Sequence, residues 1–310
     1  MRHERGDELS DSGHSSAALE QDLRRSVRGE VRFDDGARAL YATDSSNYRQ
    51  VPIGVVFPCD TQDALEALEV CRRHGAPVLP RGAGTSLAGQ ACNVAVVLDC
   101  SKHLSKVLEL DPVRRFARVE PGVVLDDLRR QAEAHHLTFG PDPATHRVCT
   151  LGGMIGNNSC GVHSVMAGKT EDNVLALDVV TAEGIRLTAE RTSEDALARI
   201  LTEPGPKADI YRGLAALRDR HADEIRRKFP HIPRRVSGYN LPALLPENGF
   251  DLARALVGSE GTCAFLLEAT VKLVESPPGR SVVAVGFEDI YAAADAVTSI
   301  LPSLPIGLEG

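Results

Sequence analysis

The 310-residue sequence contains no apolar run that approaches the ~18 residues needed to span a membrane. Its opening stretch over residues 1–16, MRHERGDELSDSGHSS, is polar and lacks the apolar region of a secretory signal. We therefore expect a cytoplasmic protein with a disordered leader over residues 1–16 and no transmembrane segment. A peripheral position at the inner face of a membrane, through a quinone-linked acceptor, is the alternative that the sequence leaves open.

The sequence also has no C-x-x-C motif, and its 7 cysteines are scattered and odd in number. This spacing speaks against an iron–sulfur cluster or a zinc site within these residues, so no metal is expected here. We expect reduced and mostly buried thiols, including Cys149 and Cys160 on either side of a glycine-rich stretch.

Clustered basic residues are absent as well. The 35 Lys and Arg residues are interspersed with 43 acidic residues, which gives a net charge of -8. Because phosphates along a nucleic acid are neutralised by clustered positive charge, we expect no nucleic-acid partner. With 43% hydrophobic residues, the chain is long enough for one large globular domain or two modest ones.

The order of predicted elements is strand, helix, strand, and then a run of strands. A helix is expected after the leader, before a turn at residues 34–36, and another over residues 60–75, which Asp60 or Thr61 caps and Gly75 ends. The remaining expected elements are strands at 54–58, 76–80 and 94–101, two strands within 106–122, a helix at 123–137, a hairpin at 173–189 that turns at 182–184, a helix at 206–230, a further short helix and a strand at 264–275.

Two further segments carry specific expectations. Residues 139–164 are so rich in glycine, proline and asparagine that we expect a long irregular loop, which inside a compact domain usually carries function. Residues 281–310 have the pattern of a strand, a helix and the start of another strand, too little for an independent core. We therefore expect this chain to be the N-terminal piece of a longer protein.

The stretch PRGAGTSLAG, residues 80–89, follows a short apolar run and is called here the first glycine loop. Gly82 and Gly84 fit a G-x-G-x-x-G fingerprint, but Leu87 occupies the third glycine position, and no P-loop lysine follows. Successive glycines still free backbone N–H groups to converge on a phosphate, while the Thr and Ser hydroxyls and Arg81 add donors and charge. The alternative is a glycine-rich surface turn.

A second glycine loop, TLGGMIGNNSCG over residues 150–161, also combines glycines with small polar side chains. It is preceded by GPDPAT, residues 140–145, whose prolines restrict the backbone and which we name the proline segment. Two glycine-rich loops, each of which follows an element of the core, suit an elongated ligand such as FAD.

Five motifs in order resemble the PCMH-type FAD-binding domain of the vanillyl-alcohol oxidase superfamily: PRGAGTSLAGQ, RVEPGVVLDDL, GPDPATHRVCTLGGMIGNNSCG, GKTEDNVLALDVVTAEG and LVGSEGTCAF. The sequence is most similar to the D-lactate, glycolate and D-2-hydroxyglutarate dehydrogenase branch, and to the N-terminal part of bacterial proteins that add an iron–sulfur module. The resemblance implies an α+β fold in which two subdomains over residues 17–280 clasp FAD. It also implies the start of a truncated cap domain at residues 281–310, with any iron–sulfur cluster only in a C-terminal region beyond them.

The resemblance further implies which residues contact FAD. They are Arg81, Gly82, Ala83, Gly84, Thr85, Ser86 and Leu87 with Gln90 in the pyrophosphate loop, Pro141, Asp142 and Thr145 beside the flavin, Thr150, Gly152, Gly153, Gly156, Asn157, Ser159 and Gly161 in a second ribitol and pyrophosphate loop, Asn173 and Val174 on the adenine side, and Glu260 and Gly261 in the G-S-E-G turn. Covalent flavin in this superfamily commonly goes with a histidine in the first loop. Because none is present here, noncovalent FAD is implied.

The activity that the resemblance implies is oxidation of a D-2-hydroxy acid to the 2-oxo acid by hydride transfer to flavin N5, with no electron acceptor specified by these residues. Such chemistry needs a base and cationic partners for the substrate carboxylate. The candidates are His146 as base and the pair Arg234 and Arg235, with Tyr239 and Asn240 as polar partners. Each has a structural alternative, namely a histidine bonded to loop backbone and a solvent-exposed basic pair, and the family's own base would lie beyond residue 310.

Two other functions stay open. One is an enolpyruvyl-sugar-nucleotide reductase of the same fold that uses NADPH, against which the GYNL stretch and the start of a cap speak. The other is a fragment that holds FAD and catalyses nothing on its own.

Overall fold

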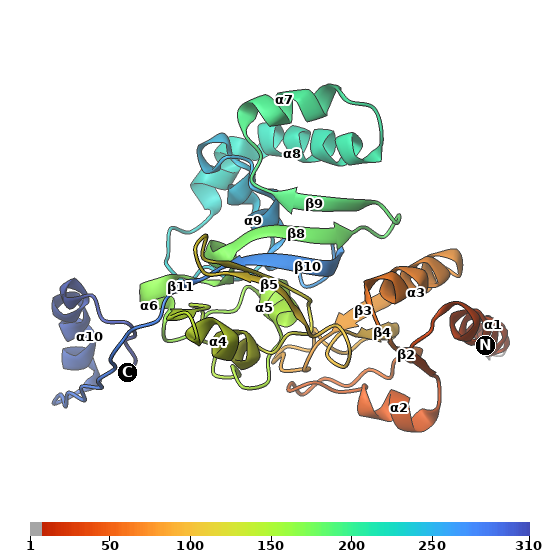
Figure 1. Ribbon diagram of the computed structural model, residues 1–310, viewed down its shortest axis with the longest axis horizontal. Helices are drawn as coiled ribbons and strands as arrows, with labels where there is room; N and C mark the ends of the chain where they lie inside the picture. Colours follow the sequence, from red (N-terminus) through yellow and green to blue (C-terminus); the bar gives the residue numbers. More distant parts are fainter. Residues whose placement is uncertain (1–7) are drawn as a thin grey trace, which may run out of the picture.

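The computed structural model describes residues 8–310, which fold into two lobes that lie against each other (Figure 1). The first lobe contains a sheet in the order β1-β2-β4-β3. β2 and β3 run parallel to β4, and β1 pairs with β2 in the antiparallel sense. Its strands are β1 (Glu30–Arg32), β2 (Gly54–Phe57), β3 (Val78–Arg81) and β4 (Val96–Asp99).

Helices α1 (Glu8–Ser26) and α3 (Thr61–Arg73) pack on this sheet, and α2 (Asp35–Leu40) precedes β2. The Asp60 side chain caps α3 by accepting from the Asp63 N–H, and Gly75 follows the helix with φ of +61°, as helix ends with glycine commonly do. The buried face of α3 includes Ala64, Ala67, Val70 and Cys71. The expected helix and its signals are confirmed here.

The second lobe is built on an antiparallel sheet in the order β5-β6-β10-β8-β9. Its strands are β5 (Val107–Asp111), β6 (Phe116–Val119), β8 (Val174–Val180), β9 (Arg186–Glu190) and β10 (Phe265–Lys272). β10 alternates buried and partly buried residues and lies between β6 and β8, so a late segment joins two earlier hairpins. β7 (Leu137–Thr138) and β11 (Val274–Glu275) form a separate small pair.

Helices cover this second sheet (Figure 1). They are α4 (Leu125–Glu133), α5 (Leu151–Asn157), α6 (Ser164–Ala167), α7 (Glu194–Thr202), α8 (Pro206–Lys228) and α9 (Leu252–Leu256), with 3-10 turns η1 (Thr170–Asn173), η2 (Leu241–Leu244) and η3 (Pro246–Asn248). α10 (Ile290–Ile300) and η4 (Leu301–Ser303) lie near the C-terminus, apart from the first lobe. None of the described helices is long and apolar enough to cross a membrane.

The two lobes share part of their hydrophobic core. The cluster beneath the first sheet contains Leu23 of α1 and Val96 of β4 and also Val180 and Phe265 of the second sheet. The larger cluster lies wholly in the second lobe, around α4, α5 and β10. The lobes therefore form one packed body, and the mixed α+β class is confirmed.

The structure corrects three expectations about regular structure. Residues 151–157, predicted as irregular, form α5, because Thr150 caps it by accepting from the Gly153 N–H. The strand expected after residue 280 is absent from the described residues, and Val282 and Val283 there are 95% and 81% exposed. No neighbouring strand pairs with this segment, and an unpaired strand has no ladder to stabilise it.

The third correction concerns the leader. Residues 1–7 lie outside the described residues, and from Glu8 onward the predicted leader belongs to α1. Beyond these three, residues 30–32, in the stretch expected as a helix, form β1, and residues 34–36, expected as a turn, are the Asp34 cap and the first two residues of α2. No helix was expected at α7, which the Ser193 side chain caps. The division of the chain at residue 280 stays a prediction.

Candidate cofactor-binding site

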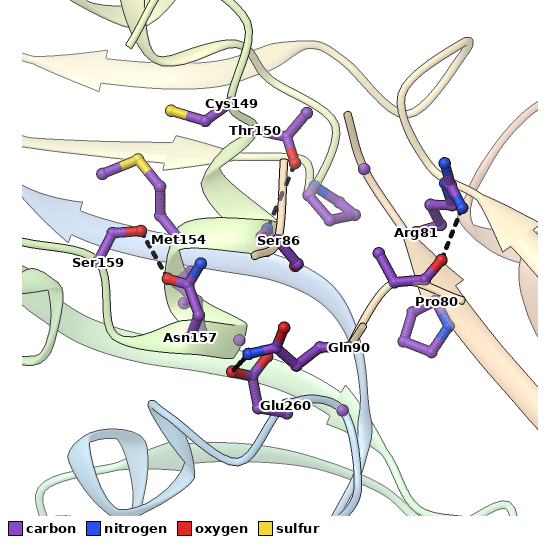
Figure 2. A pocket seen from close by; sticks show the side chains of 18 of the residues that line it. Pro80, Arg81, Ser86, Gln90, Cys149, Thr150, Met154, Asn157, Ser159 and Glu260 are labelled. Atoms are coloured by element: carbon purple, nitrogen blue, oxygen red, sulfur yellow. Dashed lines mark hydrogen bonds between the residues drawn. The ribbon is translucent and has the colours of Figure 1, made fainter. Parts of the chain in front are cut away.

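A cleft between the two lobes brings both glycine loops together (Figure 2). Its cavity volume is about 440 Å³, and its walls come from the first glycine loop, from residues 143–159 and from residues 256–266. A second cavity of about 920 Å³ shares Pro80, Gln90, Glu260, Gly261 and Ala264 with the first. The two cavities therefore form one elongated cleft.

The first glycine loop presents free backbone donors to this cleft. Within the part of the chain that the structure describes, none of the N–H groups of residues 82–87 donates to a protein acceptor. Gly84 has φ of +68°, a conformation that favours glycine. A Cβ atom at Gly82 would lie 2.1 Å from the Oγ1 of Thr150, so the two loops touch where glycine is required. Backbone N–H groups of a glycine-rich loop that have no protein acceptor suit an anionic ligand.

The Arg81 side chain has different partners from the phosphate that the sequence suggests. Its guanidinium donates to the carbonyl oxygens of Tyr41 at 3.2 Å, Thr43 at 2.8 Å and Ala91 at 2.6 Å. It also lies over the Tyr41 ring, with Cζ 5.0 Å from the ring centroid. The side chain thus holds together the segments next to the loop, and the charge expected beside a phosphate is directed into the protein.

The second glycine loop contributes α5 and the residues just after it. A Cβ atom at Gly152 would lie 2.8 Å from the backbone oxygen of Pro121, so glycine allows close packing. The Oδ1 of Asn157 accepts from the Ser159 hydroxyl at 2.5 Å, and both side chains line the cleft. The amide Nδ2 of Asn157 has no protein partner among the described residues and is available to a ligand.

Glu260 and Gln90 meet where the two cavities join. The Gln90 Nε2 donates to the Glu260 Oε1 at 3.2 Å, across the interface between the lobes. Burial raises the pKa of the Glu260 carboxyl group, and the hydrogen bond from Gln90 opposes that rise. Glu260 has φ of +53°, which is strained for a residue other than glycine, and such strain gathers at functional sites.

Two buried thiols, Cys100 and Cys149, line the first cavity, and the buried Cys92 and the exposed Cys263 line the second. Burial raises the pKa of Cys100 to about 12 and raises the pKa of Cys149 as well. Both therefore stay protonated and unreactive near neutral pH. Of the described residues that line this cavity, none is a histidine.

Most of the predicted cofactor residues line the cleft. These are Arg81, Gly82, Ala83, Gly84, Thr85, Ser86, Leu87, Gln90, Thr145, Thr150, Gly152, Gly153, Gly156, Asn157, Ser159, Glu260 and Gly261. Apolar lining residues that were not among the predicted contacts include Pro121, Met154, Leu177, Val179 and Leu266, of which the first four stand within the quoted motifs. For Leu177 and Val179 the signal was present, because both belong to a strand next to a predicted contact.

The other predicted cofactor residues lie away from this lining. Asn173 donates to the carbonyl oxygens of Ala167 at 2.7 Å and Lys169 at 2.8 Å, and the Val174 that follows is buried in the core. Pro141, Asp142 and Gly161 pack behind the cleft wall, where a Cβ atom at Gly161 would lie 1.7 Å from the Asp142 oxygen.

The candidate catalytic residues do not line the cleft either. His146 pairs with Asp126, its Nδ1 2.9 Å from the carboxylate, in a third cavity behind the proline segment. Arg234 donates to the Gly161 oxygen at 3.0 Å, and Arg235 donates to the Asn240 Oδ1 at 2.6 Å.

The polar partners of that pair are likewise engaged. The Tyr239 hydroxyl lies 2.9 Å from the Thr262 Oγ1, and Asn240 is buried, with hydrogen bonds to Glu171 and the Arg254 oxygen. The structure therefore does not bring these candidates to one substrate site.

Comparison with known proteins gives a consistent result. Residues 52–190 match the family model described as FAD binding domain. The chain is 32% identical over 292 residues to D-2-hydroxyglutarate dehydrogenase of Pseudomonas putida, covering 93% of this chain and 29% of that protein. It is 31% identical over 290 residues to the glycolate oxidase subunit GlcD of Bacillus subtilis, covering 91% of this chain and 51% of that protein.

Solved structures show the same fold. Alkyldihydroxyacetonephosphate synthase aligns with a TM-score of 0.59 at 19% identity, over 85% of this chain and 41% of that one. The chain thus spans about half or less of the length of these proteins.

Proposed function

We propose that this chain binds FAD noncovalently in the cleft and forms the flavin part of a D-2-hydroxy acid oxidoreductase, because its residues 52–190 match the FAD binding domain family model. The observation that carries this proposal is the row of unengaged N–H groups at residues 82–87, on one wall of an elongated cleft. The names of the relatives, a D-2-hydroxyglutarate dehydrogenase and a glycolate oxidase subunit, support the substrate class.

The residues of the cleft fit the parts of FAD. The free amides of the first glycine loop, with the Asn157 amide, would bind the pyrophosphate oxygens. Glu260 and Gln90, at the junction of the two cavities, would bind sugar hydroxyls. Leu177 and Val179 would contact an apolar ring face.

The chemistry that FAD supplies when bound is hydride acceptance from the carbon that carries the substrate hydroxyl, which converts a 2-hydroxy acid to a 2-oxo acid. The chain's own residues orient the cofactor and enclose it on two sides. The proposal of noncovalent attachment is supported by the lack of a histidine among the described residues that line the first cavity and by the raised pKa values of the Cys100 and Cys149 thiols there.

A second candidate is favoured by a specific observation. None of the predicted base and carboxylate-binding residues lines the cleft, so the described chain alone would hold FAD without oxidising a hydroxy acid. In that case catalysis needs residues that the described chain does not supply.

The test begins with the visible absorption spectrum of the purified chain and a titration of its FAD-free form. We expect saturable binding of FAD, complete release of flavin on denaturation, and weaker binding of riboflavin, which lacks the pyrophosphate. D-2-hydroxyglutarate, glycolate and D-lactate are then added without oxygen. Bleaching by one acid supports the oxidoreductase, whereas a stable flavin spectrum supports the second candidate. A folded chain that takes up no FAD would overturn both.

A further inference from the structure

The proline segment has two faces with different roles. Pro143, Ala144 and Thr145 line the FAD cleft. Asp142 faces the opposite way, into the third cavity of about 500 Å³, together with Arg129 and other charged side chains. A wall of the cleft is thus built by a segment whose anchoring groups are hidden from the ligand.

Arg129 of α4 is the main anchor. Its side chain is only 18% exposed. Its Nε donates to the Phe139 oxygen at 3.2 Å, its Nη1 to the Asp142 Oδ1 at 2.6 Å, and its Nη2 to the Pro141 oxygen at 3.0 Å. One planar guanidinium therefore holds three of the four residues 139–142, a geometry that a lysine could not reproduce.

The helix that carries Arg129 is itself held firmly. Leu125, Leu128 and Ala132 of α4 are fully buried in the core of the second lobe. Pro141 and Pro143 of the proline segment have no N–H group to donate, and the Pro143 and Thr145 oxygens accept backbone hydrogen bonds only from residues 146–149, which follow directly in the chain.

Asp142 extends the connection to the residues after the second glycine loop. One carboxylate oxygen accepts from Arg129, and the other lies 3.2 Å from the His163 Nδ1. The backbone at Asp142 also packs directly against Gly161. Asp142 therefore lies between α4 and the chain that follows α5.

We propose that Arg129 and Asp142 are positioning residues for FAD: from behind the cleft wall, they fix the proline segment in the conformation that receives the cofactor. This inference rests on the proposed function. A wall that is ordered before binding removes the entropy cost of ordering it with the ligand, and affinity rises accordingly. Neither residue contacts the cleft.

The experiment compares two neighbouring arginines. Arg130 follows Arg129 on the same helix, but its side chain is 75% exposed and pairs with Asp127 three residues earlier. Arg129→Met is expected to weaken FAD binding about tenfold or more, with Arg129→Lys in between and Arg130→Met within about twofold of the unmodified chain. Isothermal titration of the FAD-free proteins measures these dissociation constants.

A second readout needs no cofactor. Arg147 is exposed and lies just after the proline segment, so trypsin cleavage there reports on the order of the segment. Cleavage after Arg147 is expected to be faster in Arg129→Met than in Arg130→Met, in the absence of FAD. If Arg129→Met does not fold, Arg129→Lys and Asp142→Asn are expected to change both readouts in the same direction.

The outcomes are distinct. A variant that unfolds at a lower temperature but binds FAD and is cleaved like the unmodified chain would show a purely structural role and overturn the proposal. If the unmodified chain binds no FAD, the proposed function fails, while the cleavage rates still report whether Arg129 orders the segment. The effect of Arg129→Met combined with Asp142→Asn is expected to be smaller than the sum of the two single effects, because both changes remove the Arg129–Asp142 hydrogen bond.

Discussion

Gln90 donates a hydrogen bond to Glu260 at 3.2 Å although the two residues are 170 positions apart in the chain. Gln90 follows the first glycine loop, and Glu260 precedes β10, so the bond joins the two lobes at the cleft. The carboxyl group that receives it is half-buried, which makes the pair sensitive to pH.

Replacing Glu260 tests that sensitivity. Because burial raises the pKa of this carboxyl group above its ordinary 4.5, the fold favours the protonated form. The protonated Glu260 carboxyl group therefore makes its full contribution to stability below pH 4.5, and this contribution is lost as the pH rises through the raised pKa. Glu260→Gln is expected to raise the melting temperature at pH 7 and to leave it unchanged at about pH 4.

Thermal unfolding monitored by circular dichroism across this pH range measures the effect. Glu66→Gln, at an exposed position of α3, is the control and is expected to produce no such pH-dependent difference. A gain from Glu260→Gln that is the same at both pH values would contradict the assignment to ionisation.

The cysteines are expected to differ widely in reactivity. Cys263 is exposed, whereas Cys100 is buried and its pKa is raised to about 12. Because the thiolate is the reactive form, Ellman's reagent at pH 8 is expected to modify Cys263 rapidly and Cys100 only on unfolding. Cys263→Ser is expected to remove the fast phase. Rapid labelling of Cys100 in the folded chain, detected by peptide mass analysis, would disprove its buried placement.

Two helical glycines are expected to respond oppositely to the same substitution. Gly152→Ala in α5 would place a Cβ atom 2.8 Å from the Pro121 backbone, which cannot move freely, so it is expected to destabilise the fold and weaken FAD binding. Gly213→Ala in α8 meets no atom within 4 Å. It is expected to stabilise the protein by roughly 0.5–1 kcal/mol, because alanine favours a helix interior.

Urea unfolding of both glycine variants provides the measurement, with FAD titration for the first. Equal stability changes at the two positions would mean that close packing at Pro121 does not require glycine.

Arg81→Met is expected to act mainly on stability. The guanidinium makes hydrogen bonds to the carbonyl oxygens of Tyr41, Thr43 and Ala91, and its loss leaves those acceptors without a partner. We expect a loss on the order of 2–4 kcal/mol in the free energy of unfolding. FAD affinity, measured at a temperature where the variant is folded, is expected to fall less than for a lost phosphate contact. A large loss of affinity at unchanged stability would restore the phosphate role suggested by sequence.

Local signals allowed much of the fold to be predicted. The cap at Asp60, the glycine at position 75 and the alternation in β8 and β9 each act within a few residues, so the corresponding elements are confirmed. α5 was hidden because its glycines disfavour helix on average, while the Thr150 cap and packing against Pro121 compensate.

The site was predictable in its loops but not in its side-chain directions. The glycine-rich motifs indicated the residues of the cleft wall, because the binding groups of such loops are their main-chain N–H groups. Arg81 turns to carbonyl oxygens about 40 positions away, and Asp142 turns to a helix behind the wall. A short motif does not contain such distant partners, so it cannot indicate where the side chain points.

The position of β10 in the second sheet determines when that sheet can be completed during synthesis. β10 fills the gap between the β5–β6 and β8–β9 hairpins, and the turn that carries Glu260 immediately precedes it. During synthesis the hairpins therefore leave the ribosome with an open edge each, and the sheet is completed only after residue 272 has emerged. A nascent chain shorter than this would have both glycine loops but no closed cleft, so we expect it to bind no FAD before β10 has emerged.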